Sequence, residues 1–157
     1  MSTKNNQQKG FTLLEILLVV AAIAILAGIV IVALNPGKQL GETRDGERRS
    51  DINTLMNATY QYSIDNNGDF PAAIDTATDT VQVIGTGSSC TCDATAAEGT
   101  CVDLSGDLVP TYLAGIPTDP RYGSAEETKY YINRTADERI VVGACSPEES
   151  NAIEIIR

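Results

Sequence analysis

The chain contains no histidine and no tryptophan among its 157 residues. Histidine is the commonest general base and the commonest metal ligand, so its absence excludes Ser-His-Asp and Cys-His catalysis and ordinary zinc hydrolase sites. The sequence also has no Gly-rich phosphate loop and no G-x-S-x-G nucleophile motif. We therefore expect a protein that is not an enzyme and that has no cofactor and no metal site.

Basic and aromatic residues are also few. The chain has 11 Lys and Arg against 21 Asp and Glu, which gives a net charge of −10 at pH 7, and aromatic residues make up 5%. Binding to nucleic acid requires clustered Lys and Arg, so we predict no direct nucleic-acid site. The scarcity of aromatic side chains predicts one modest domain with a small core.

The longest apolar run extends from Ile16 to Leu34 and is interrupted only by Gly28. A helix over residues 11–34 is about 36 Å long, which is enough to cross a hydrocarbon core of about 30 Å. We therefore predict a transmembrane helix at 11–34. Lys4 and Lys9 precede it without an acidic residue, so the N-terminus should face the cytoplasm and the rest of the chain should face outward.

One acidic residue, Glu15, lies about one turn inside this apolar helix. A carboxylate there costs up to about 3 kcal/mol on insertion scales unless it is protonated or paired. From its position alone, Glu15 either reaches back to the lipid headgroups or pairs with a cation from another molecule.

The stretch KGFTLLE at residues 9–15 resembles the processing signal of type IV pilin-like proteins, which include type IV pilins and type II secretion pseudopilins. The resemblance implies that a prepilin peptidase cleaves after Gly10, removes residues 1–10, and N-methylates Phe11. It also implies that Glu15 is an assembly residue, which pairs with the amine of Phe11 on a neighbouring subunit. A subunit out of register in a water-poor filament core would leave both charges unpaired, at a cost of about 3–5 kcal/mol.

Beyond the apolar run, residues 35–37 (Asn-Pro-Gly) predict either a break with a new helix start or a simple kink. Residues 38–66 have a helical pattern. The first half is polar on every side, and we interpret its charges as a solvated face, or as partners between subunits of a filament. The second half is amphipathic, which predicts a stripe covered by a sheet, formed by Ile52, Leu55, Met56 and Thr59.

The helix is expected to end in residues 65–71, where Asp65, Asn67 and Asp69 alternate as at the start of a calcium loop. Phe70 and Thr76 occupy the positions of the required glycine and glutamate, so we interpret the segment as a turn. This junction resembles that of type II secretion major pseudopilins.

The segment at 112–120 also resembles a segment of these pseudopilins. Arg121-Tyr122-Gly123 replaces the family's usual Trp-Gly, so the family's calcium loop is not carried over to this chain.

Residues 72–107 are rich in Ala, Thr, Gly, Ser and Asp, and we predict a loop region with one short strand at 81–84. Residues 128–133 and 139–145 have the pattern of an antiparallel hairpin, and 152–156 that of an edge strand. The predicted fold class is therefore α+β, the pilin fold, with a long N-terminal α-helix packed on a small C-terminal antiparallel β-sheet at about 128–156.

All four cysteines follow the apolar run. Outside the cytoplasm they should form disulfides. Two pairings remain open: Cys90 with Cys101 and Cys92 with Cys145, or Cys92 with Cys101 and Cys90 with Cys145. A Cys₄ zinc site is the alternative, but C-x-C is not the usual zinc spacing.

The predicted organisation is a cleaved leader at 1–10, a transmembrane and filament-core helix at 11–34, and an extracytoplasmic head at 35–157. The resemblance implies a filament subunit, either of a type IV pilus or of a type II secretion pseudopilus. It would be stored in the lipid of the inner membrane, processed by prepilin peptidase, and polymerised into a homo-oligomeric filament by an assembly platform and a motor ATPase. The alternative is an uncleaved, signal-anchored membrane protein with an extracytoplasmic binding domain.

Overall fold

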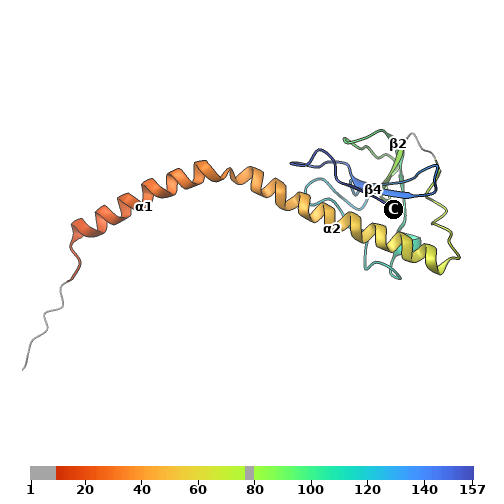
Figure 1. The fold of residues 1–157 in the computed structure, drawn as a ribbon, viewed down its shortest axis with the longest axis horizontal. Helices are drawn as coiled ribbons and strands as arrows, with labels where there is room; N and C mark the ends of the chain where they lie inside the picture. The colour runs from red at the N-terminus through yellow and green to blue at the C-terminus, as the bar shows by residue number, and fades with distance from the viewer. Residues whose placement is uncertain (1–9, 77–79) are drawn as a thin grey trace, which may run out of the picture. The chain divides into compact units, whose positions relative to one another are not determined.

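The structure is a computed structural model that describes residues 10–76 and 80–157, and its internal contacts divide the chain into two units. One unit extends to Gln39, and the other covers Leu40–Arg157. Figure 1 shows the order of the helices and strands along the chain.

The first unit contains helix α1, Leu13–Leu34. None of its residues is buried, because large aliphatic side chains point outward on every side. The helix is long and apolar enough to cross a membrane. The structure thus confirms the predicted N-terminal apolar helix.

A break followed by a new start separates α1 from helix α2, Pro36–Asp65. Asn35 has φ 41°, in the left-handed region, where Asn is among the few residues that adopt it readily. Its carbonyl accepts bonds from the N–H groups of Lys38 and Gln39, so the same residue ends α1 and begins α2. Pro36 then occupies the first helical position, where a missing N–H costs nothing.

The second unit packs α2 against a sheet (Figure 1). The sheet has five strands in the order β2-β1-β3-β4-β5, and a short helix, α3, follows β2. Their bounds are β1 Val81–Ile84, β2 Ala97–Val102, α3 Ser105–Leu108, β3 Tyr130–Arg134, β4 Ile140–Ala144 and β5 Glu154–Ile156.

The fold class is α+β as predicted, and the strands expected at about 128–156 pair antiparallel, but the five-stranded sheet as a whole is mixed. The β1–β2 pair is parallel, while the other three pairs are antiparallel. The segment expected to be a loop, 72–107, also contains β2 and α3 as well as the predicted short strand. The sequence of β2, AEGTCV, has no strand pattern, so this strand depends on pairing with β1 rather than on its own propensity.

The main core lies between α2 and one face of the sheet. Ile52, Leu55 and Met56 are almost completely buried, so the predicted stripe is confirmed. They pack with alternating residues of the central strands, such as Tyr130 and Ile132 of β3. The intervening Tyr131 belongs to a second, smaller cluster with two half-cystines.

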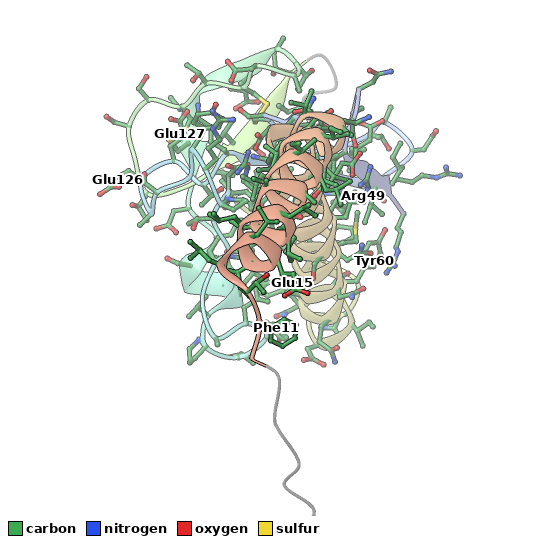
Figure 2. The ribbon with its side chains drawn as sticks, turned by 90° about the vertical axis from the view of Figure 1, so that its left-hand side faces the viewer. Phe11, Glu15, Arg49, Tyr60, Glu126 and Glu127 are labelled. Carbon is green, nitrogen blue, oxygen red and sulfur yellow. A yellow bond between two sulfur atoms is a disulfide. The ribbon has the colours of Figure 1, made fainter. Side chains whose placement is uncertain are left out.

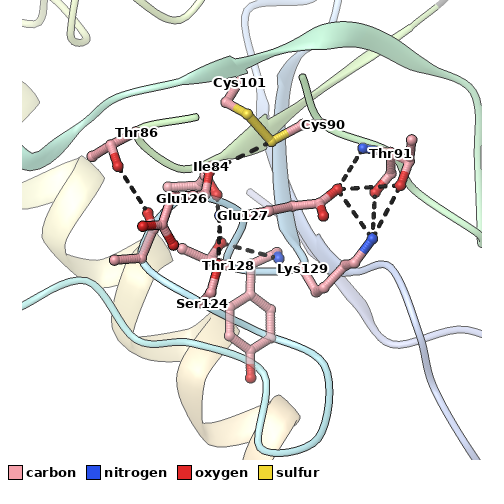
Figure 3. The surroundings of a disulfide bond; sticks show 12 residues. Ile84, Thr86, Cys90, Thr91, Cys101, Ser124, Glu126, Glu127, Thr128 and Lys129 are labelled. Atoms are coloured by element: carbon pink, nitrogen blue, oxygen red, sulfur yellow. Dashed lines mark hydrogen bonds and ion pairs between the residues drawn. A yellow bond between two sulfur atoms is a disulfide. The ribbon is translucent and has the colours of Figure 1, made fainter. Parts of the chain in front are cut away.

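The four cysteines form the first of the two pairings left open, Cys90 with Cys101 and Cys92 with Cys145. The segment before β2 is thereby tied both to β2 and to the residue that follows β4. Figure 3 shows that the same segment is also held by polar contacts, because Lys129 Nζ donates to the Thr91 carbonyl at 3.2 Å and pairs with Glu127 at 3.0 Å. These cross-links fix a region with little hydrophobic sequence.

The first half of α2 contains a buried arginine, which corrects the interpretation of its charges as a solvated face. Arg48 is completely buried. Its guanidinium donates to Asp119 from Nε at 2.6 Å and from Nη2 at 3.1 Å, and to Asp45 at 2.8 Å. It also forms an ion pair with Glu148 at 3.1 Å. Part of the polar half of the helix therefore faces the head of its own chain.

The two buried acids of this cluster also order the loops around it. Asp45 accepts the backbone N–H groups of residues 148, 149 and 150 at 2.9–3.0 Å. Asp119 accepts those of Arg121 and Tyr122 at 2.9 Å each. Glu148 also binds Arg44 and Arg121. The cluster connects α2 to two loops that follow it by some 70 and 100 positions.

The surroundings of these carboxylates favour their charged forms. Burial by itself would raise the pKa of Asp45, but hydrogen bonds from three backbone N–H groups and from Arg48 outweigh it and lower the pKa to about 2. The bond from Arg44 is the main cause that lowers the pKa of Glu148 to about 2. Burial alone would raise the pKa of Asp119, but the hydrogen bond from Arg48 is the main cause that lowers it.

We predict that Arg48→Met lowers the free energy of unfolding by about 3–5 kcal/mol, because it leaves buried carboxylates without their cation. The adjacent Arg49→Met is the matched control. Arg49 is exposed, and its guanidinium donates to the Ser150 hydroxyl, so its loss should cost less than about 1 kcal/mol. Urea unfolding of both variants measures the difference, and equal losses would contradict a structural role for Arg48.

The cluster also predicts acid sensitivity. The pKa of Asp45 in the folded chain, about 2, lies below the value of about 3.9 for an unperturbed Asp, so the unfolded chain binds more protons between these values. The free energy of unfolding should therefore be highest above about pH 5 and fall as the pH decreases toward 2. Thermal unfolding at several pH values measures this slope. Asp45→Asn should have a shallower slope below pH 5, and an unchanged slope would exclude Asp45 as its source.

Candidate processing and assembly site

The bond between Gly10 and Phe11, the expected cleavage site, lies just before α1. Both residues are exposed and non-helical, and Thr12, with φ −79° and ψ 151°, has an extended backbone just before the helix start at Leu13. The ring of Phe11 is 86% exposed. Exposed terminal segments outside regular structure are the preferred places for proteolysis. The local structure is therefore compatible with cutting after Gly10.

Glu15 lies in the first turn of α1, close to Phe11 (Figure 2). Its side chain forms a capping box with Thr12. Oε2 of Glu15 accepts the Thr12 N–H and hydroxyl at 2.9 Å each, while Thr12 Oγ1 accepts the Glu15 N–H at 3.2 Å. Two backbone donors at the helix start are satisfied in this way.

The capping box gives Glu15 a role that the sequence analysis missed. The signal for it was present, because Thr followed by Glu three positions later is the usual capping-box spacing. The donors are neutral, however, so they hydrogen-bond the carboxylate without cancelling its charge. The capping role and the expected role in assembly are therefore compatible.

Glu15 lines an apolar hollow of ≈ 420 Å³ at the start of α1. Glu15 is the one charged residue among those that line it, together with Phe11, Leu14, Ile16, Leu18 and Val19. Glu15 is exposed, so its carboxylate becomes poorly hydrated, and interacts strongly with a cation, only when an apolar environment covers this part of the helix. The chemistry of the hollow suits an amine carried on an apolar group.

The structure brings Gly10, Phe11 and Glu15 together within one unit, whereas the four cysteines belong to the other unit and serve its stability. Over residues 10–76 and 80–157, no group of three or more Cys, Asp and Glu is arranged to hold a metal ion. The candidate site is therefore the start of α1.

Comparison with known protein families gives one match. Residues 5–31 match the family model for the prokaryotic N-terminal methylation motif. Comparison with curated proteins and with solved structures gives no match. The matched range includes Gly10, Phe11, Glu15 and most of α1, so the resemblance noted in the sequence is confirmed. The chain thus carries the type IV pilin and pseudopilin signal at its N-terminus, followed by an apolar helix and an α+β architecture of the pilin kind.

Proposed function

We propose that this chain is the structural subunit of a helical extracytoplasmic filament, either a type IV pilus or a type II secretion pseudopilus. The observation that carries the proposal is the N-terminal methylation motif, which leads directly into a fully exposed apolar helix with a carboxylate in its first turn. An exposed helix of this kind has to be covered by lipid or by other copies of itself. In the proposed subunit, lipid covers the helix before assembly, and other copies of the helix cover it in the filament.

Cleavage after Gly10 by a prepilin peptidase would create the cation that Glu15 lacks. Removal of the leader turns the amide nitrogen of Phe11 into an amine, which the same enzyme methylates and which stays charged at neutral pH. Within residues 10–76 and 80–157, the donors to the Glu15 carboxylate come from Thr12. In the filament core, the Phe11 amine of a neighbouring subunit would supply the missing charge and set the axial register.

The apolar surface of α1 also restricts the route of assembly. Lipid is as apolar as the aliphatic side chains, so burial alone does not draw the helix out of the bilayer. In water, each large aliphatic side chain costs about 1.5–3 kcal/mol, which makes an aqueous intermediate highly unfavourable. Subunits should therefore pass directly from the inner membrane into the filament, lifted by a motor ATPase on an assembly platform.

The alternative function is an uncleaved, signal-anchored membrane protein whose head binds a partner outside the cell. It shares the apolar helix and the outward-facing head, so neither feature separates it from a filament subunit. The two functions differ in the fate of the leader and in the need for a charge at Glu15.

We predict that the mature protein from cells begins at Phe11 and carries one N-methyl group. The mass of the intact protein and of its N-terminal peptide measures both properties. Gly10→Val should keep the leader, because it places a branched side chain next to the bond that is cut. A wild-type chain that still begins at Met1 or Ser2 would favour the signal-anchored alternative.

Three variants separate the charge of Glu15 from its capping role. Glu15→Gln keeps an acceptor for the capping box but loses the charge, whereas Thr12→Val loses the cap, at about 1 kcal/mol, but keeps the charge. Glu15→Val loses both. We expect Glu15→Gln and Glu15→Val to insert in the membrane and to form few filaments, and Thr12→Val to form filaments. Electron microscopy and membrane fractionation measure these outcomes. Normal filaments from Glu15→Gln would refute the charge-pairing role.

A further inference from the structure

We propose that the head carries a second assembly contact, in which Tyr122 and Arg121 of one copy insert into an apolar pocket beside Asp103 on the next copy. This inference rests on the proposed filament function and deepens it, because it identifies surfaces by which neighbouring heads would recognise each other.

The pocket lies between the end of β1, the segment that contains α3, and the loop at 115–128. Its volume is ≈ 270 Å³. A cavity of about 150 Å³ holds a benzene molecule, so this pocket has room for one tyrosine side chain. Its apolar walls come from Ile84, Val109, Ile116 and Ala125, and Asp103 adds a carboxylate.

The pocket is preformed by hydrogen bonds within the head. The hydroxyl of Thr128 donates to the Ile84 carbonyl at 2.7 Å (Figure 3). The Thr86 N–H donates to the Ala125 carbonyl at 3.1 Å. The first bond joins β1, and the second joins the segment just after β1, to the loop on the opposite side of the pocket. A preformed pocket loses little conformational entropy when a side chain enters it.

Asp103 provides an exposed negative charge at this pocket. Its carboxylate accepts the Ser105 N–H at 2.8 Å, and the hydrogen bonds from the side chain and the backbone of Ser105 lower the pKa of Asp103. In the part of the chain that the structure describes, no Lys or Arg forms an ion pair with Asp103. The site therefore suits an apolar group with a positive charge beside it.

Such a group is present on another surface of the same head. The Tyr122 side chain is about half exposed, at 51%, and the Arg121 guanidinium lies over its ring at 4.9 Å. Asp119 fixes the turn that presents them, because its Oδ1 accepts the N–H groups of both residues. Gly123 closes the turn where a side chain would collide with the Asp119 backbone. The aromatic ring and the cation are therefore held together in one place.

Tyr122 fits the pocket better than the other exposed large hydrophobic residues that the structure describes in the head. The side chains of Leu40, Ile64 and Ile156 have no polar group that could bind the carboxylate. Tyr122 carries a hydroxyl donor and a stacked arginine. Arg121 contacts Glu148, which also binds Arg44 and Arg48, so Glu148 keeps two cations when Arg121 turns toward a neighbour.

The geometry points to a contact between copies rather than within one. Tyr122 borders a different hollow from the pocket, next to Asp93 and Pro147. A contact that joins two different surfaces of identical molecules is heterologous, and it generates an open helical array when the rotation does not close. That is the symmetry which the proposed filament requires.

The experiment replaces Tyr122 in the full-length chain with the photo-crosslinking residue p-benzoylphenylalanine, which keeps an aromatic side chain there. Filaments are assembled from this variant mixed with ¹⁵N-labelled wild-type chain, irradiated, and digested for mass spectrometry. The isotope identifies cross-links between copies. We expect cross-links from position 122 to peptides that contain residues 84–86, 103–109 or 115–118 of another copy. The same photo-residue at Ile64, which is also exposed, should not cross-link to those peptides.

A charge variant tests the electrostatic part. Asp103→Lys should lower the cross-link yield from position 122 by about two- to fivefold, the range for one exposed ion pair. Asp107→Lys is the matched control, since Asp107 lies in α3, four positions after Asp103, but does not line the pocket. The cross-link yield with this variant should equal that with the wild-type pocket.

The outcomes are distinct. Cross-links between copies at the pocket, reduced by Asp103→Lys alone, support the contact. Filaments whose position 122 cross-links elsewhere, or only within one chain, overturn the contact and leave the proposed function intact. A wild-type chain that keeps its leader and forms no filaments refutes the proposed function, and the contact fails with it. The N-terminal mass distinguishes this last case from the previous one.

Discussion

The buried guanidinium of Arg48 is the constraint on which the organisation of the head depends. It contacts carboxylates from α2, from the turn at 119–123 and from the segment at 148–150, and these three parts are far apart in sequence. A charge completely out of water is tolerated only when such partners surround it, so the native arrangement of both loops is required once Arg48 is buried. The interaction therefore favours one arrangement of the loops over others more than it adds to net stability.

The composition of the head explains why it depends on polar and covalent cross-links. The chain has few aromatic residues and no tryptophan, so the apolar core between α2 and the sheet is small. Two disulfides fix the segment around β2, and the Arg48 cluster fixes the turn at 119–123 and the segment at 148–150. Small domains commonly compensate for a limited core by such means.

Features encoded over short distances were predictable from the sequence. The apolar helix, the stripe at Ile52, Leu55 and Met56, and the hairpin of β3 and β4 each follow from a local periodicity, and the structure has all of them. The N-terminal motif was recognisable because its residues are contiguous. The roles expected for Gly10, Phe11 and Glu15 stay predictions.

Features that depend on distant partners were not predictable. Arg48 stands in a run of charges that looks solvated, and its partner Asp119 follows 71 positions later. Strand β2 has no pattern of its own and exists through parallel pairing with β1. The cysteine spacing left two pairings open, because the choice depends on how the loops return to the sheet. The capping role of Thr12 was the exception, since its signal was local and was overlooked.

The capping box at the start of α1 has a consequence for the order of events in the proposed life of the subunit. In the proposed precursor, Phe11 would have no terminal amine, and the Glu15 side chain is bonded to Thr12. Both Thr12 donors to Oε2 of Glu15 are neutral, so in the proposed filament the amine of a neighbouring subunit would replace hydrogen bonds. Under this proposal, the cap binds the Glu15 carboxylate until proteolysis creates the amine that replaces it.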